Sequence, residues 1–219
     1  MITLPKSCES ARHFIDGEFF FKMATLGGNA VICADGRMHG WLHDYVLDKP
    51  GYWLFEHGHL CAIDGELAKY GKRLWQTHHM FLPHMELTAI TPGMPVRWFE
   101  QGDIGQFYGD MRFSNARSTT FSPERPDVLA VAAYEAGRII GMAGCSADTE
   151  DLWQVGIDVL ADCRGRGVGT YLVKLLKNEI LIRGKIPYYG TSLSNLGSWR
   201  VALSSGFYPA WIEVATVEE

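Results

Sequence analysis

Three glycines alternate with other residues in the stretch CRGRGVGT, residues 163–170. An apolar run typical of a strand, residues 152–160, precedes this stretch, and a run with helical spacing, residues 170–183, follows it. The first N–H groups of a helix have no intrahelical partner, and the helix dipole adds partial positive charge there. Glycine lets the backbone turn sharply and lets a ligand approach it closely. A strand, a glycine-rich turn and a helix in this order therefore predict an anion-binding loop.

The hydrophobic spacing after residue 95 predicts strands and helices throughout. Three strands in succession, with a hairpin turn at Glu135-Ala136-Gly137 between the first two, predict an antiparallel meander. The helix after the glycines has one apolar face and a stop signal at Gly184. The predicted order is strand, helix, three strands, helix, strand, helix and strand, at residues 96–99, 103–112, 128–134, 138–146, 152–160, 170–183, 186–193, 198–204 and 207–214.

The N-terminal part of the chain has a different character. All eight histidines lie within the first 84 residues, and Thr-Pro-Gly-Met-Pro at residues 91–95 then interrupts the chain. We expect an N-terminal module at residues 1–94 and a second domain at residues 95–219. The histidine spacings match no standard zinc pattern, and aromatic neighbours indicate packing, so no metal site is expected. The histidines considered were His57, His59, His78, His79 and His84.

Composition restricts the partners of the chain. Its net charge of −5 argues against a general nucleic-acid binder. No apolar run reaches the roughly 18 residues that a membrane helix needs, and the first residues lack the features of a secretory signal. Five scattered cysteines without a CxxC pair argue against disulfides, and Cys163 is interpreted as a small apolar filler. These features predict a cytoplasmic protein without a membrane or nucleic-acid partner, whose anion site is local.

Two nucleotide-binding motifs resemble the glycine stretch but fit it poorly. A Walker loop needs Lys-Ser or Lys-Thr after its last glycine, and this chain has Thr170-Tyr171 there. A dinucleotide fingerprint has the spacing G-x-G-x-x-G in the first strand–helix–strand unit, whereas this loop has G-x-G-x-G and follows a meander. A glycine-rich turn without any ligand stays open as the purely structural interpretation.

Two stretches resemble the motifs of the GNAT acyltransferase superfamily. VLADCRGRGVGTYLVKLL, residues 159–176, is similar to the central motif of that family, and residues 195–207 match part of a second signature through Asn195, Gly206 and Phe207. The resemblance covers residues 96–214. It implies a GNAT-like α/β (α+β) fold, which is a mixed sheet with an antiparallel meander, splayed central strands and flanking helices, here with the N-terminal module added.

The resemblance also implies a ligand and a reaction. The ligand is acetyl-CoA as co-substrate, the reaction is direct attack by an amine acceptor, and no metal takes part. The diphosphate of the co-substrate would lie on backbone amides after Cys163, and a bulged, splayed donor strand would offer free backbone groups to the pantetheine arm. The residues implied to bind it are Ile157, Val159, Arg164, Gly165, Arg166, Gly167, Val168, Gly169, Thr170, Asn195 and Ser198.

Catalytic groups follow less directly from the resemblance. A backbone N–H near Val159 is implied as the oxyanion donor, Asn195 is implied near the thiol, and Asp158 is a candidate base. The tyrosine that often protonates the thiolate in this family falls at Ala202 here. The alternative donors are Ser198, Ser204, Tyr208 and water. Asp110 and Arg112 lie in the segment where the family often builds its acceptor wall, and Glu150 and Asp151, in the turn before the donor strand, are interpreted as solvated charges.

Three functions remain open from the sequence. The favoured one is an acetyl-CoA-dependent N-acetyltransferase. The absence of a tyrosine at Ala202 motivates a second, a non-catalytic acyl-CoA sensor or scaffold. The third is a nucleotide-dependent enzyme that uses the same loop. The acceptor is not identified by the sequence, and family members are often homodimers.

Overall fold

The computed structural model describes residues 1–4, 20–91 and 93–217. The helices are α1 (His39–Val46), α2 (His57–Ala68), α3 (Gln101–Ile104), α4 (Val168–Ile182) and α5 (Leu196–Ser204). The strands are β1 (Ile2–Thr3), β2 (Phe21–Thr25), β3 (Ala30–Ala34), β4 (Arg73–Leu74), β5 (His78–Pro83), β6 (Val96–Glu100), β7 (Asp127–Glu135), β8 (Arg138–Ala147), β9 (Leu152–Val159), β10 (Ile186–Ser192) and β11 (Phe207–Val217).

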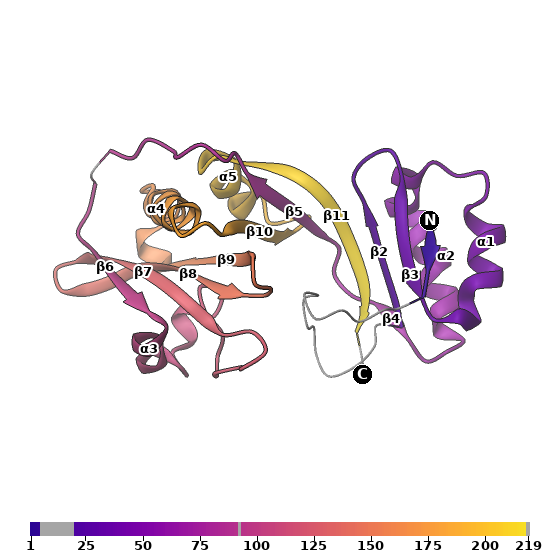
Figure 1. The fold of residues 1–219 in the computed structure, drawn as a ribbon, viewed down its shortest axis with the longest axis horizontal. Coiled ribbons are helices and arrows are strands. Elements are labelled where there is room, and N and C mark those ends of the chain that lie inside the picture. The colour runs from indigo at the N-terminus through magenta and orange to yellow at the C-terminus, as the bar shows by residue number, and fades with distance from the viewer. Residues whose placement is uncertain (5–19, 92, 218–219) are drawn as a thin grey trace.

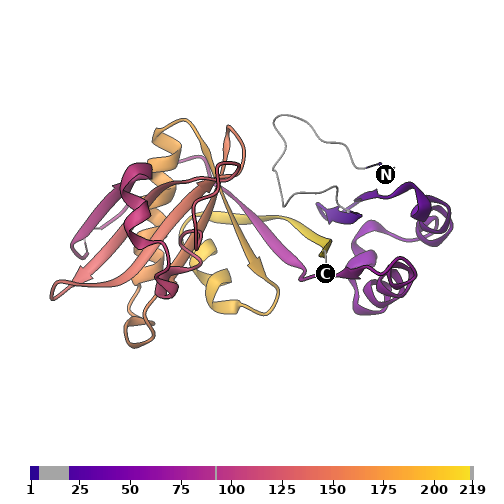
Figure 2. The same cartoon turned by 90° about the horizontal axis from the view of Figure 1, so that it is seen from below.

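The described residues form one 11-stranded mixed sheet with the order β1-β3-β2-β11-β5-β10-β9-β8-β7-β6, and β4 pairs with β11 at its side. Figures 1 and 2 show two bodies, which β5 and the long strand β11 connect. In the C-terminal body, α4 and α5 lie on one side of the sheet and α3 lies on the other (Figure 1). The predicted fold class, a mixed α/β fold with flanking helices, is confirmed.

The predicted meander is present in β7, β8 and β9. β7 pairs antiparallel with β8, and β8 pairs antiparallel with β9. The hairpin between β7 and β8 turns at Ala136 and Gly137, both of which have positive φ. Helix α4 covers this part of the sheet with one buried face, which includes Leu172, Leu176 and Ile180. The sequence predicts these strands and this helix correctly because the apolar residues follow local patterns, with alternation in the strands and helical spacing in α4.

The helix predicted at residues 103–112 overlaps the observed α3 only at Asp103 and Ile104, and the rest of it is wrong. α3 ends at Ile104, and 3₁₀ turns follow at Gly105–Phe107 and Met111–Phe113. Gly109, with φ +87°, breaks the chain between those turns. The apolar residues of this segment fill a separate core cluster against β7 and β8, so burial, not helical periodicity, decides its path.

Strand pairing crosses the predicted boundary at residue 94. β5 precedes that boundary, yet it lies between β10 and β11 and pairs antiparallel with both. Phe81 of β5 is fully buried in the core under α4 and α5. A second core holds β2, β3, α1 and α2, and Val214 of β11 also belongs to it. The division of the chain into domains at residue 94 stays a prediction, with β5 as the segment that the C-terminal sheet shares.

Candidate active site

β9 and β10 part in the middle of the sheet. Their parallel pairing ends at Val155 and Tyr189, although β9 continues to Val159 and β10 continues to Ser192. Beyond this point β10 keeps its pairing with β5, from Tyr189 to Ser192, and therefore follows β5 away from β9. The resemblance implied a bulge in β9 as well, but that expectation is wrong, because the register between β8 and β9 is continuous.

Every second residue of β9 directs its backbone N–H and C=O groups into the opening between β9 and β10. The amide of Leu160 donates to the carbonyl of Ile140 on the β8 side at 3.0 Å. Because backbone groups alternate sides along an antiparallel pair, Ile157 and Val159 direct theirs away from β8 and into the opening. The carbonyl of Val159 accepts a bond from Nε of Arg164 at 3.2 Å. The opening thus has polar backbone groups of β9 along one side.

The glycine loop opens α4 as an amide cradle. Gly165 and Gly167 have φ values of +75° and +80°, a left-handed backbone that favours glycine, and Gly167 is the N-cap of the helix. The amide of Tyr171 makes the first helical bond, to the carbonyl of Gly167 at 3.0 Å. The N–H groups of the three residues before Tyr171 therefore have no intrahelical acceptor. A Cβ atom at Gly169 would lie 3.4 Å from Cγ2 of Val159, so this turn packs directly against β9.

A cleft of about 840 Å³ joins the loop to the opening between β9 and β10. It continues past the opening to the loop of residues 114–118 and to the start of β5. Of the residues predicted to bind the co-substrate, all but Arg166 line this cleft. The predicted residues that line it are Ile157, Val159, Arg164, Gly165, Gly167, Val168, Gly169, Thr170, Asn195 and Ser198.

Arg166 is directed away from the cleft. Its guanidinium forms a two-pronged pair with the carboxylate of Glu135, the last residue of β7, and its Nη1 lies 3.1 Å from Oε2. This pair raises the pKa of Arg166 and lowers that of Glu135. The side chain therefore ties the glycine loop to the end of β7, in contrast to the predicted contact with an anion.

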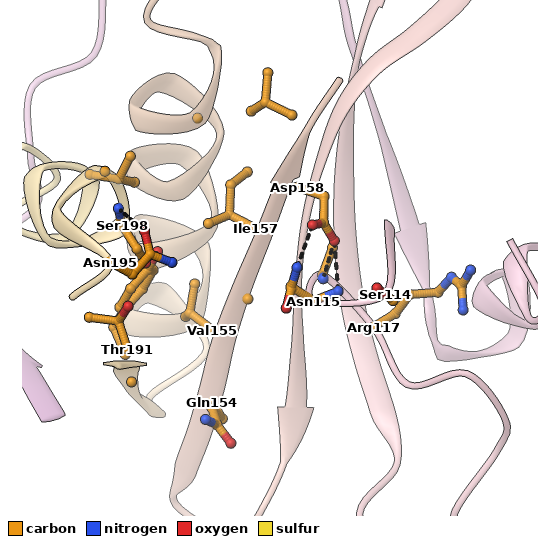
Figure 3. A pocket seen from close by; sticks show the side chains of 18 of the residues that line it. Ser114, Asn115, Arg117, Gln154, Val155, Ile157, Asp158, Thr191, Asn195 and Ser198 are labelled. Carbon is orange, nitrogen blue, oxygen red and sulfur yellow. Dashed lines mark hydrogen bonds between the residues drawn. The ribbon is translucent and has the colours of Figure 1, made fainter. Parts of the chain in front are cut away.

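The two faces of β9 carry different neighbours, as Figure 3 shows. Ile157 points toward Asn195 and Ser198, whereas Asp158 points toward Asn115. We call the first face the helix side of the cleft, which also includes Val155, Val159 and Tyr189. We call the second the loop side, which includes Gln154, Gly156, Asp158 and residues 114–118.

Asp158 holds the loop side together. Its carboxylate accepts hydrogen bonds from the backbone N–H of Asn115 at 2.7 Å, from Nδ2 of Asn115 at 2.6 Å and from the N–H of Ala116 at 3.0 Å (Figure 3). The loop of residues 114–118 also packs directly against Gly156 of β9, because a Cβ atom at Gly156 would stand 1.7 Å from the carbonyl oxygen of Asn115. A carboxylate that is fully engaged in this way favours a positioning role over the predicted role as base.

Sequence reasoning missed Tyr189 on the helix side of the cleft. Its hydroxyl lies 2.7 Å from Oγ of Ser198, and burial raises the pKa of the phenol. Asn195 caps α5 by accepting the N–H of Ser198 at 3.1 Å. Ala202, where the family resemblance placed a tyrosine, is fully buried in the same core cluster as Tyr189. Two adjacent tyrosines in β10 were visible in the sequence, but only strand pairing shows which of them faces the cleft.

The other predicted acid–base candidates lie elsewhere. Asp110 pairs with the guanidinium of Arg112 at 2.7 Å, which lowers the pKa of that carboxyl. Asp151 lies 3.5 Å from Nζ of Lys185 at the far end of β9. These groups and Glu150 are not among the residues that line the cleft.

The histidines among the described residues are spread over both bodies. His59 bonds the hydroxyl of Tyr45 at 2.8 Å, and the ring of His79 packs edge-on against Trp199 with 4.8 Å between centroids. His78 lines the cleft, whereas the ring of His84 lies 5.2 Å from that of Tyr208. In the described part of the chain, no group of three or more His, Cys, Asp or Glu side chains is arranged to hold a metal ion.

Comparison with protein families decides the assignment. The model of the GNAT acetyltransferase family matches residues 98–207, slightly more than half of the chain. The chain belongs to the GNAT acetyltransferase family. The match begins in β6 and ends at the start of β11, so it includes the glycine loop, the opening between β9 and β10, and α5. A comparison with curated protein sequences finds no match.

Solved GNAT structures share the fold at low sequence identity. A GCN5-related N-acetyltransferase-like protein from Streptococcus suis has a TM-score of 0.54 at 14% identity, with 91% of this chain and 81% of that chain covered. A GCN5-related N-acetyltransferase from Sphaerobacter thermophilus has a TM-score of 0.51 at 15% identity, with coverages of 90% and 76%. A GNAT-family protein from Novosphingobium aromaticivorans has a TM-score of 0.52 at 18% identity, with 67% of this chain and 66% of that chain covered. The match therefore spans just under two thirds of the length of that protein.

None of the described helices is both long enough and apolar enough to cross a membrane.

Proposed function

We propose that this GNAT protein transfers an acetyl group from acetyl-CoA to an amine by direct attack. The observation that carries the proposal is the parting of β9 from β10 immediately beside the amide cradle of α4. The cradle suits a diphosphate, and the opening suits a narrow, amide-containing arm that ends in a thioester. An acidic chain can hold such a polyanion here because backbone N–H groups, and not net charge, form the cradle.

The chain's own residues fit each part of the co-substrate. The amides between Gly165 and Thr170 would bind the diphosphate, and Arg164 lines the same end of the cleft. The carbonyl of Ile157 and the N–H of Val159, which face the opening, would pair with the pantetheine amides. The thioester end then lies near Tyr189, where β9 and β10 meet.

The reaction needs three groups, and the cleft has a candidate for each. Acetyl-CoA supplies the activated carbonyl, whose bond to sulfur breaks as the bond to nitrogen forms. The thioester end lies four residues from Val159 along β9, so the N–H of Ile157, in place of the predicted N–H of Val159, would donate to the carbonyl oxygen. The hydroxyl of Tyr189 would give its proton to the departing thiolate. The imidazole of His78, which lines the cleft, would accept the proton that the amine loses. Ser198, bonded to Tyr189, would fix the orientation of the phenol.

The location and assembly of the protein are also proposals. Cys33, Cys61, Cys145 and Cys163 are free thiols, which agrees with a reducing compartment, and we therefore propose a cytoplasmic enzyme. A homodimer stays a prediction that rests on the family resemblance.

Thiol release from acetyl-CoA tests the proposed function. We expect release of free CoA that depends on an added primary amine, measured with a thiol reagent across a panel of amino acids, polyamines, aminoglycosides and peptides. We also expect CoA near 100 times its dissociation constant to stabilise the protein by about 2.7 kcal/mol in thermal unfolding. Stabilisation by CoA without release by any amine would instead support the sensor. A larger stabilisation by ATP or NAD than by CoA would support a nucleotide-dependent enzyme.

A further inference from the structure

A cationic side chain, Arg125, lines the loop side of the cleft. Its Nε donates to Oδ1 of Asp148 at 2.8 Å and to Oγ of Ser146 at 3.1 Å, and its Nη2 donates to Oε1 of Gln154 at 2.7 Å. The side chain of Arg125 is 39% exposed, whereas that of Asp148 is fully buried. One edge of the guanidinium is thus anchored in the protein while the side chain stays partly open to solvent.

The anchor beneath Arg125 is a buried polar network. Oγ of Ser146 donates to Oδ1 of Asp148 at 2.7 Å, and the hydroxyl of Tyr188 donates to the other carboxylate oxygen. Within the described residues, no protein acceptor lies against Nη1 of Arg125. The bonds to Nε and Nη2 hold one edge of the guanidinium and thereby fix the orientation of the edge formed by Nη1 and Nη2. That edge can donate two parallel hydrogen bonds to a carboxylate.

The other charged side chains of the loop side are engaged by the protein. Asp127 is 3% exposed and accepts the N–H of Ser118 at 3.0 Å. Asp158 is engaged by the backbone of the same loop. Arg117 is only 4% exposed, and its Nη2 donates to the carbonyl of Asp110. Arg125 is therefore the cationic side chain of the loop side that combines an anchored edge with exposure to the cleft, since Arg117 is buried and the oxygens of Asp127 and Asp158 accept bonds from the protein.

Arg125 also lies close to the reacting end of the opening. Gln154, which accepts its hydrogen bond, immediately precedes Val155, where β9 and β10 part. A strand rises about 3.3 Å per residue, so this contact lies on the order of one or two residues from the opening. A ligand group held by Arg125 is then only a few bonds away from an atom in the opening.

We infer that the acceptor is a small amine that carries a carboxylate a few bonds from its nitrogen, as an α-amino acid does, and that Arg125 binds this carboxylate. The inference deepens the proposed acyl transfer and rests on it for the role of the ligand. The binding site itself follows from the cleft, the anchored guanidinium and the engaged carboxylates.

The test compares α-amino acids with their carboxamides and with the matching α-aminophosphonates. We expect kcat/KM with acetyl-CoA to be about 10- to 100-fold higher for the amino acid than for its carboxamide, the range of a hydrogen-bonded charge pair. Arg125→Gln is expected to remove this ratio, and Arg125→Lys is expected to keep part of it because the charge remains while the planar fork is lost. Arg97→Gln, which removes an exposed arginine that does not line the cleft, serves as control and should keep the full ratio.

A binding measurement keeps the inference testable if acyl transfer itself fails. The protein saturated with CoA is unfolded thermally with each amino acid or carboxamide added, for the wild type and the Arg125 variants. Stabilisation by the amino acid alone, lost in Arg125→Gln, would support the site even without turnover. Equal effects of amino acid and carboxamide on the wild type, or a ratio that survives undiminished in Arg125→Gln, would overturn it. A preference for aminophosphonates would overturn the choice of a carboxylate.

Discussion

Gly167→Asp abolishes the stabilisation of the protein by CoA if the loop before α4 is a diphosphate site. Gly167 is the N-cap of α4 and has φ +80°. A Cβ atom at this position meets nothing within 4 Å, so the new carboxylate has room to reach into the cradle. There it would satisfy the free amides of the first turn and repel an incoming anion. Thermal unfolding with and without CoA is expected to show a shift in the wild type and none in the variant.

A matched variant at the other end of the same helix separates binding from backbone strain. Gly184 follows α4, has φ +73°, and its Cβ position is equally open. Gly184→Asp is expected to lose a similar amount of stability without ligand, about 1 kcal/mol for a left-handed backbone. It should nevertheless keep the full shift with CoA. Stabilisation of Gly167→Asp to the wild-type extent would show that the diphosphate does not bind at this turn.

Tyr189→Phe is expected to lower kcat by about 100-fold, at the low end of the effect of a positioned general acid. The phenyl ring can keep the packing of Tyr189 against Phe81 and Phe207, so the fold should be retained. Only the hydroxyl, bonded to Ser198, is removed. Because the hydroxyl acts on the departing thiolate and not on the nucleotide, the KM for acetyl-CoA should change little. Steady-state kinetics of thiol release measure both constants.

The pH profile distinguishes a proton donor from a packing residue. Burial raises the pKa of Tyr189, so the phenol stays protonated through neutral pH, and activity falls only as the pH rises through that raised value. This alkaline limb should be absent in Tyr189→Phe. Tyr171→Phe removes a hydroxyl that bonds the carbonyl of Met94 outside the cleft, and it should leave kcat and the pH profile unchanged. A wild-type kcat in Tyr189→Phe would contradict the assignment.

The parts of the fold that were predictable have local signals. The glycine loop, the apolar face of α4 and the β7–β8 hairpin are each encoded within about 20 consecutive residues, in spacing and turn chemistry. The backbone groups of Ile157 and Val159 could be placed because strands alternate and because the family motif fixed the position of β9. Predictions of this kind depend only on residues that are close together in the sequence, so they do not require knowledge of the rest of the chain.

The parts that were not predictable depend on distant segments. β5 reaches the centre of the sheet through pairs with β10 and β11, which lie more than 100 residues further along the chain. The role of Tyr189 depends on a bond to α5, and the exposure of Arg125 depends on a carboxylate buried beneath it. Asp158 looked like a free acid in the sequence because the loop that binds it lies about 40 residues earlier.

A crystal structure of the protein with bound CoA tests the central claim most directly. We expect diphosphate oxygens within hydrogen-bond distance of the amides between Gly165 and Thr170, and the pantetheine arm between β9 and β10 with its sulfur beside Tyr189. CoA bound with its diphosphate away from this turn, or an arm that does not enter the opening between the two strands, would contradict it.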